Sequence, residues 1–176
     1  PSDIQEYANR WGYCRDEFST SGGWPHQLYV REGRRMISEV VMTEHHCRGT
    51  AVVKDSIGLA SYNMDSHNCR RFVRDGHVMN EGDVEVSGGK PYPVSYQSIL
   101  PHERYCANLA VPVCLSASHI AYGSIRMEPV FMILAQSAAI AIGMAIESRR
   151  TALHRIPYNL LASELTRAGQ VLQWHA

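Results

Sequence analysis

Three stretches of the chain predict helices. Residues 30–43 carry an apolar stripe with charged residues mostly on the other faces, and they predict a helix. Residues 130–146 form a longer apolar stretch behind Pro129, which the first turn of a helix accepts, so a helix is expected over about 129–147. Its side chains are mostly small, which predicts close neighbours on several sides. A last short helix is expected over 157–168.

Short strands are predicted between these helices. Residues 57–64 have β-type composition, and residues 75–90 contain glycine turns between short runs, which predict one or two β-hairpins. Residues 92–96 form another extended piece, and the continuous apolar run 109–115 predicts a strand buried on both faces. The expected fold class is therefore mixed, α/β or α+β, with a small mixed sheet around the central buried helix 129–147.

The charge balance argues against a general nucleic-acid-binding protein. The chain has 176 residues, 17 of them basic and 17 acidic, with a formal net charge of zero, whereas phosphate neutralisation needs a clear basic excess. The length suits one domain, and one compact unit is expected. The apolar stretch 130–146 contains Gln136 and Ser137. It therefore predicts a buried helix rather than a membrane span, and neither a membrane nor a signal peptide is expected.

Metal-binding and disulfide-rich classes are also disfavoured. The five cysteines are an odd number and include no CxxC pair. His45, His46 and His67 do not supply three ligands at a metal-binding spacing, so we expect no metal. The sequence contains no GxGxxG turn, the motif that binds a dinucleotide pyrophosphate.

The densest group of reactive side chains lies in residues 61–67. Tyr62, Asp65 and His67 could supply proton transfer, because histidine titrates near neutrality and the three lie within six residues. The alternative is a turn in which Asp65 makes local hydrogen bonds.

Two further groups are candidates for chemistry. Arg126 precedes the long helix, where it could hold a carboxylate or form a structural ion pair with Glu128 or another acid. Ser116 or Ser118 beside His119 imitates a nucleophile and its base. Residues so close in sequence seldom have triad geometry, so we exclude acyl transfer.

Most of the chain resembles one known family. The run LAVPVCLSASHIAYGSIRMEP at 109–129, continued by VFMILAQSAAIA, resembles the C-terminal flavin-contacting segment of the FAD-dependent oxidoreductases. Some members of that family carry the name xanthan lyase. The resemblance extends to five other segments: Tyr29–Arg35, Asp55–Gly58, Ser61–His67, Pro91–Tyr96 and Leu165–Val171.

The resemblance implies FAD as the cofactor and assigns residues to its site. The implied cofactor-binding residues are His119, Gly123, Ser124, Ile125, Arg126, Glu128, Pro129 and Val130. The positive end of the helix that begins there would face the flavin pyrimidine edge and favour the anionic reduced flavin. On the substrate side, the implied catalytic residues are Tyr62, Asp65, His67 and Arg126.

The chain departs from the wider family at three points. Many relatives have Gly-Arg where Pro112-Val113 stands, an arginine contact that this chain lacks, and glycine where Ala135 stands. The Rossmann GxGxxG unit is absent, so the resemblance implies the C-terminal portion of a two-part flavoprotein. We therefore expect the isolated chain to hold no FAD and to be inactive without an N-terminal dinucleotide-binding half as its partner.

Composition and the resemblance together divide the chain into three segments. Residues 1–25 are expected to be an irregular lead-in, and residues 26–105 a substrate-side α/β layer. Residues 106–176 are expected to supply a strand, loop and helix that complete the flavin site, followed by the C-terminal helix.

Three functions from different classes follow. The favoured one is a redox flavoenzyme in the intact protein, acting on a small molecule or saccharide. The second is a polysaccharide lyase, in which Tyr62 or His67 is the base and Arg126 or Asn63 neutralises a uronic carboxylate. The third is a non-catalytic assembly module, and a homo-oligomer is expected to bury the surface that a missing neighbour would leave.

Overall fold

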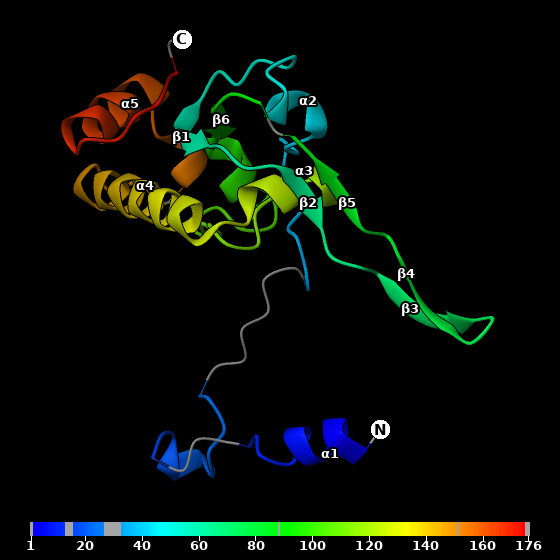
Figure 1. Ribbon diagram of the computed structural model, residues 1–176. Coiled ribbons are helices and arrows are strands. Elements are labelled where there is room, and N and C mark those ends of the chain that lie inside the picture. The colour runs from blue at the N-terminus through cyan, green and yellow to red at the C-terminus, as the bar shows by residue number, and fades with distance from the viewer. Residues whose placement is uncertain (1, 13–15, 27–32, 88, 151, 175–176) are drawn as a thin grey trace. The chain divides into compact units, whose positions relative to one another are not determined.

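The computed structural model describes residues 2–12, 16–26, 33–87, 89–150 and 152–174. Two compact units are present, residues 1–30 and residues 31–176. The second unit contains every described strand and every described α-helix except the first (Figure 1).

The first unit contains a short helix within the 1–25 stretch, where the sequence predicts an irregular lead-in. Helix α1, Ser2–Ala8, has Asp3 in its first turn, where an acidic side chain interacts favourably with the positive helix end. A 3-10 turn, η1, follows at Ser19–Ser21. None of the residues of α1 is buried.

The two predicted C-terminal helices are confirmed. Helix α4, Glu128–Glu147, is the longest element and has a proline in its first turn. Helix α5, Tyr158–Arg167, follows it. The remaining helical elements of this unit are short: α2 (Glu44–Cys47), η2 (Tyr96–Ile99), α3 (His119–Ile125) and η3 (Leu153–Arg155).

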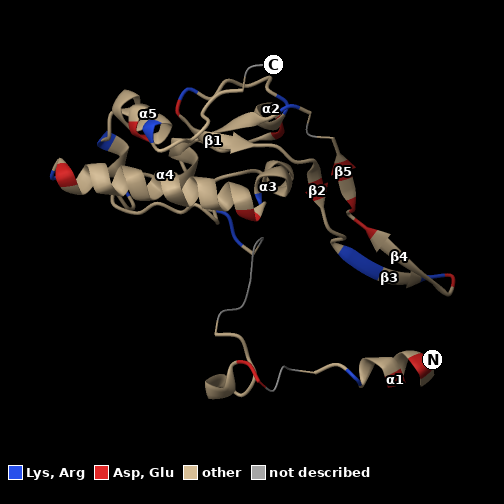
Figure 2. Ribbon diagram, turned by 60° about the vertical axis from the view of Figure 1, so that its left-hand side comes forward, with Lys and Arg blue, Asp and Glu red and all other residues tan. Residues whose placement is uncertain are grey.

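The strands form three separate antiparallel pairs, so the mixed α and β class is confirmed. Strand β1 (Ser56–Ala60) pairs with β6 (Tyr92–Ser95), β2 (Met64–Ser66) with β5 (Val84–Val86), and β3 (Arg70–Arg74) with β4 (His77–Glu81). The predicted hairpin is confirmed at Asp75-Gly76, where both residues have positive φ as the turn between β3 and β4 requires. This hairpin extends from the other elements of its unit and carries arginines on β3 (Figure 2).

The helix predicted over 30–43 is wrong for the residues that the structure describes. Residues 30–32 lie outside the described ranges, and residues 33–43 form no helix. Instead, the Met36 and Met42 backbone N–H groups donate to the carbonyls of Cys114 and Ser116 at 2.8 and 3.0 Å. The apolar spacing is real, but hydrogen bonds to a distant segment satisfy the backbone better than a local helix would.

The strand predicted at 109–115 is also wrong. This segment bends at residues 112–114 and joins no described ladder, and Leu109 and Val113 are exposed rather than buried. The Val111 N–H donates to the Ile99 carbonyl at 2.7 Å. Pro112 has no N–H to give to a ladder, which explains why regular pairing does not continue. In place of one small mixed sheet, the unit has three two-stranded pairs and one isolated parallel bridge between Met42 and Ala117.

Helix α4 packs directly on strand β1. A Cβ at Gly58 would lie 2.2 Å from the Ile133 side chain, so the helix approaches β1 as closely as a glycine allows. The Ser137 hydroxyl donates to the Ile57 carbonyl at 2.7 Å. Of the described helices, α4 is the one long and apolar enough to span a membrane, and 39% of its most apolar window is buried inside the chain. One face of α4 is therefore a core face, whereas its outer residues are exposed.

Helix α2 depends on a neutral histidine, which makes its stability sensitive to acid. The Thr43 backbone N–H donates to His46 Nδ1 at 3.0 Å, so that nitrogen acts as an acceptor. Burial, and then the neighbouring His45, lower the pKa of His46 below its ordinary value of 6.5. The unfolded chain therefore binds a proton first as the pH falls, and stability is lost below about pH 6.5.

We expect the free energy of unfolding to fall between pH 7.5 and pH 5, because the hydrogen bond from the Thr43 N–H requires the neutral His46 imidazole. Urea denaturation at the two pH values measures the change. A His46→Ala variant should lose this part of the pH dependence, whereas His77→Ala, at an exposed position on β4, should retain it. An equal pH response in the wild type and His46→Ala would contradict the assignment.

Candidate functional site

Helix α3 and strand β2 lie against one another at a glycine. A Cβ at Gly123 would lie only 2.1 Å from the Asp65 carbonyl oxygen, so no larger residue fits this contact without a backbone shift. The close approach joins two segments that the sequence predicts to be functional. Asp65 belongs to the predicted substrate side and Gly123 to the predicted flavin loop.

The same contact contains an ion pair. Arg126 Nη2 donates to Asp65 Oδ2 at 3.4 Å and to the Asp65 carbonyl at 3.2 Å. The Arg126 side chain is 1% exposed and that of Asp65 is 27% exposed. Of the two roles considered for Arg126, the structure shows an ion pair with an acid, and the acid is Asp65. One carboxylate edge is thus fixed from inside the protein while part of the group faces solvent.

A buried chain of hydroxyl groups positions the backbone of Tyr62, two residues before β2. The Tyr92 hydroxyl donates to Ser124 Oγ at 2.7 Å, and Ser124 Oγ donates to the Tyr62 carbonyl at 2.6 Å. Burial raises the pKa of the Tyr92 phenol and of the nearby Cys47 thiol, so both groups stay protonated near neutral pH. This chain fixes the Tyr62 backbone, while the Tyr62 side chain is 44% exposed.

Strand pairing adds an acidic residue that the sequence analysis missed. Glu85 on β5 lies directly opposite Asp65 on β2, and like charges in that position repel each other. The Asn63 amide donates to Glu85 Oε1 at 3.3 Å. Arg126 therefore offsets the charge of a site with two carboxylates. The β3–β4 hairpin lies between β2 and β5 in the chain. Glu85 could therefore be identified as a neighbour of Asp65 only from the pairing of these two strands.

The predicted residues divide into an exposed group, a buried group and the partly exposed Asp65, whose side chain can also reach a ligand. Tyr62, His67, His119, Glu128 and Pro129 are exposed. Five predicted residues are buried and pack against the chain's own atoms: Gly123, Ser124, Ile125, Arg126 and Val130. The buried residues build the α3–α4 corner, and the exposed residues are the ones that can reach a ligand.

Two features of the described residues favour negative charge. The 20-residue helix α4 begins at the exposed Glu128-Pro129, and its positive end favours negative charge, with the acidic Glu128 already in the first turn. A cavity of about 390 Å3 beside residue 117 is lined by Arg34 and Arg35, which suits an anionic group. Neither feature is a glycine-rich cradle for a pyrophosphate.

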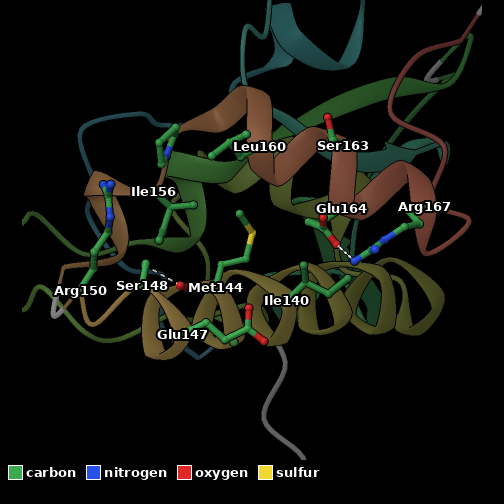
Figure 3. Close-up of a pocket in the computed structure, with 12 residues that line it drawn as sticks. Ile140, Met144, Glu147, Ser148, Arg150, Ile156, Leu160, Ser163, Glu164 and Arg167 are labelled. Atoms are coloured by element: carbon green, nitrogen blue, oxygen red, sulfur yellow. Dashed lines mark hydrogen bonds and ion pairs between the residues drawn. The ribbon is translucent and has the colours of Figure 1, made fainter.

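A larger cavity lies between α4 and α5. Its volume is about 660 Å3, and its lining includes Ile140, Met144 and Leu160, with charged residues at the rim (Figure 3). Glu164 and Arg167 form an ion pair across one part of that rim. None of its lining residues belongs to the predicted site. The described residues contain no group of three His, Cys, Asp or Glu side chains that could hold a metal ion.

Comparison with known proteins agrees with the resemblance seen in the sequence. The family model described as FAD dependent oxidoreductase matches residues 2–165. No curated protein and no solved structure matches the chain. Because the family match covers nearly all of the 176 residues, this chain belongs to the FAD dependent oxidoreductase family.

Proposed function

We propose that this chain forms the substrate-side wall and one flavin-contacting edge of an FAD-dependent oxidoreductase site. The proposal includes a dinucleotide-binding part supplied from outside these 176 residues. It rests chiefly on the ion pair between Asp65 and Arg126. That pair ties the strand with the substrate-side residues to Arg126, two residues before α4 begins at Glu128. Substrate and flavin residues are thereby joined through one rigid corner.

Different residues of this chain would bind the substrate and orient the group that binds it. FAD, when bound, supplies the two-electron chemistry of substrate oxidation. The partly exposed Asp65 carboxylate accepts a hydrogen bond or a proton from a substrate hydroxyl or amine. Arg126 is a positioning residue, because it is buried and holds that carboxylate from behind. The exposed Tyr62 phenol and His67 imidazole flank the strand and supply further hydrogen bonds.

The start of α4 is the proposed flavin edge. The unsatisfied N–H groups of a long helix carry a partial positive charge that favours an anionic ring. Glu128 and Pro129 are exposed there, and His119 is exposed at the start of α3. These residues are the proposed flavin contacts, whereas Gly123, Ser124 and Ile125 support them from the interior.

The geometry gives less support to lyase chemistry. A lyase needs a cation or amide donor that reaches the uronic carboxylate of its substrate. Arg126 is 1% exposed and directed to Asp65, so it is poorly placed for that role. In the redox function Arg126 only has to hold the Asp65 carboxylate in place, and a buried arginine can do that.

Flavin titration of the purified chain tests the proposal. We expect quenching of flavin fluorescence with riboflavin and FAD to similar extents, with dissociation constants on the order of 1 mM, because the proposed contacts are to the ring alone. His119→Ala should weaken both by about threefold, the effect of one lost hydrogen bond. His77→Ala, an exposed histidine on β4, is the matched control and should change neither.

Two outcomes would count against the proposal. FAD retained in equimolar amount after desalting would mean that the chain holds the whole cofactor by itself. The absence of quenching with either flavin at millimolar concentration would remove the flavin-contacting role from this chain.

A further inference from the structure

The cavity lined by Arg34 and Arg35, called the Arg34–Arg35 cavity, has a cationic wall without an acidic counterpart. Its volume is about 390 Å3, within the range of about 300–1,000 Å3 that is typical of small-ligand pockets. None of the described residues that line it is acidic. The one acid between residues 33 and 43, Glu39, is paired instead with His102 Nδ1 at 2.5 Å. The described residues therefore leave the positive charge of this cavity without a counter-ion.

The Arg35 side chain is held in place before any ligand binds. Its Nε donates to the Ala117 carbonyl at 3.0 Å, and its guanidinium lies over the Tyr122 ring, 5.8 Å from the ring centroid. The carbonyl and the ring are uncharged, so they fix the orientation of the guanidinium without neutralising it. An arginine oriented in advance binds an oxyanion at a lower cost in conformational entropy than a mobile one.

Two further hydrogen-bond donors line the same cavity. Arg34 is exposed and forms no hydrogen bond or ion pair with any residue of the described ranges. Ser116 is 1% exposed, and its hydroxyl oxygen accepts a hydrogen bond from the Ser38 N–H at 3.2 Å. No acceptor in the described part of the chain takes the Ser116 hydroxyl proton, so this group can still donate. The lining thus offers two guanidinium groups and a hydroxyl to an anion.

The rest of the lining is largely apolar. Met36, Ile37 and Val41 line the Arg34–Arg35 cavity, and the last two are 75% and 42% exposed. An inorganic oxyanion would leave these side chains in water, whereas an alkyl chain attached to the oxyanion would cover them. The lining is therefore complementary to a molecule that has one anionic end and one apolar end.

We propose that the Arg34–Arg35 cavity binds a small organic acid, with its carboxylate on the two arginines and its alkyl chain against Ile37 and Val41. The site does not depend on the proposed flavin contacts, because none of them lines this cavity. A free phosphate ion has the same oxyanion chemistry but no apolar end, and the experiment below separates the two ligands by that difference.

Nuclear magnetic resonance titration of the full chain with sodium hexanoate, sodium acetate and inorganic phosphate tests the proposal. Sodium chloride keeps the ionic strength constant, and no flavin is added. We expect hexanoate to bind with a dissociation constant on the order of 1 mM, the strength available to about eight non-hydrogen atoms. Acetate and phosphate should bind at least about tenfold more weakly, because neither covers the apolar lining. The shifts of the backbone amides should be confined to residues 33–41 and 116–117.

Substitution of Arg34 tests the cationic end of the site. Arg34→Gln should weaken hexanoate binding by about fivefold, because one charged donor is lost. Arg71→Gln is the matched control, since Arg71 is also exposed, lies on β3 outside the cavity and gives the same change of net charge; it should change the dissociation constant less than about twofold. Far-ultraviolet circular dichroism checks that both variants fold. Equal affinities of Arg34→Gln and the wild type for hexanoate would overturn the proposal.

Substitution of Ile37 tests the apolar end. Ile37→Ser should weaken hexanoate binding by about threefold and leave acetate binding unchanged. Val52→Ser is the control, because Val52 is 82% exposed and lies outside the cavity, and it should change neither. Phosphate binding at least as tight as hexanoate binding would overturn the assignment to an organic acid. Amide shifts that map to α4 and α5 instead, or no shifts with hexanoate up to about 20 mM, would overturn the site itself.

Discussion

Replacing Gly123 with alanine is expected to cost about 3 kcal/mol of unfolding free energy or more. The added Cβ would lie 2.1 Å from the Asp65 carbonyl oxygen and 3.0 Å from its carbonyl carbon. Both atoms belong to the backbone of β2, so no side-chain rotation can relieve the clash. Helix α3 would have to move away from β2, and the hydrogen bonds from Arg126 to Asp65 would lengthen with it.

The sign of this effect is informative because helix propensity acts in the opposite direction. Alanine is more favourable than glycine inside a helix by about 1 kcal/mol, so a loss of stability reports the α3–β2 contact itself. Gly143→Ala is the matched control, since Gly143 is also helical and no atom lies within 4 Å of the added Cβ. That variant should be as stable as the wild type or slightly more stable.

Urea denaturation of the three proteins, followed by circular dichroism, makes the comparison. Unfolding free energies of Gly123→Ala and the wild type that agree within about 0.5 kcal/mol would mean that α3 and β2 are not held this closely.

Replacing Arg126 with methionine should also cost about 3 kcal/mol. Removing one partner of a buried ion pair typically costs about 3–5 kcal/mol, because the remaining charge is left without its counterpart. The Asp65 side chain is 27% exposed, so water compensates part of that charge and the lower end of the range applies. Repulsion between Asp65 and Glu85, which face each other on paired strands, adds to the loss.

An exposed arginine supplies the control for this variant. Arg155 forms an ion pair with Glu103 at 3.0 Å, but the side chains are 73% and 42% exposed. Arg155→Met should therefore cost less than about 0.5 kcal/mol. Similar losses of unfolding free energy for Arg126→Met and Arg155→Met would show that burial does not strengthen the Arg126–Asp65 ion pair.

A double-mutant cycle separates the ion pair from the packing of the long arginine side chain. Asp65→Asn removes the charge of the partner while keeping its shape. If the pair holds β2 to α3, the two substitutions together should cost less than the sum of their separate effects by about 1 kcal/mol or more. Additive costs would assign the role of Arg126 to packing alone.

Parts of the candidate site could be named from the sequence, but their arrangement could not. The types of Tyr62, Asp65 and Arg126, together with the family resemblance, predict these three as site residues. The sequence left open whether Arg126 would bind a ligand group or pair with an acid. Its partner Asp65 lies 61 positions away in the chain, and patterns of neighbouring residues cannot predict a contact over that separation. Glu85 was not identified, because its place opposite Asp65 depends on strand pairing across a hairpin.

The sequence by itself determined the features that local physics controls. The apolar stretch behind Pro129 produced α4, the Asp75-Gly76 turn produced the hairpin, and the long run 109–129 identified the family. Only the tertiary structure decided the path of residues 33–43 and the lack of a strand at 109–115. In both segments the backbone donates to carbonyls elsewhere in the unit. The apolar pattern did not decide burial there either, since Ile37 is 75% exposed and Leu109 is 46% exposed. Hydrogen bonds between distant segments decide the backbone conformation, and a local pattern does not contain them.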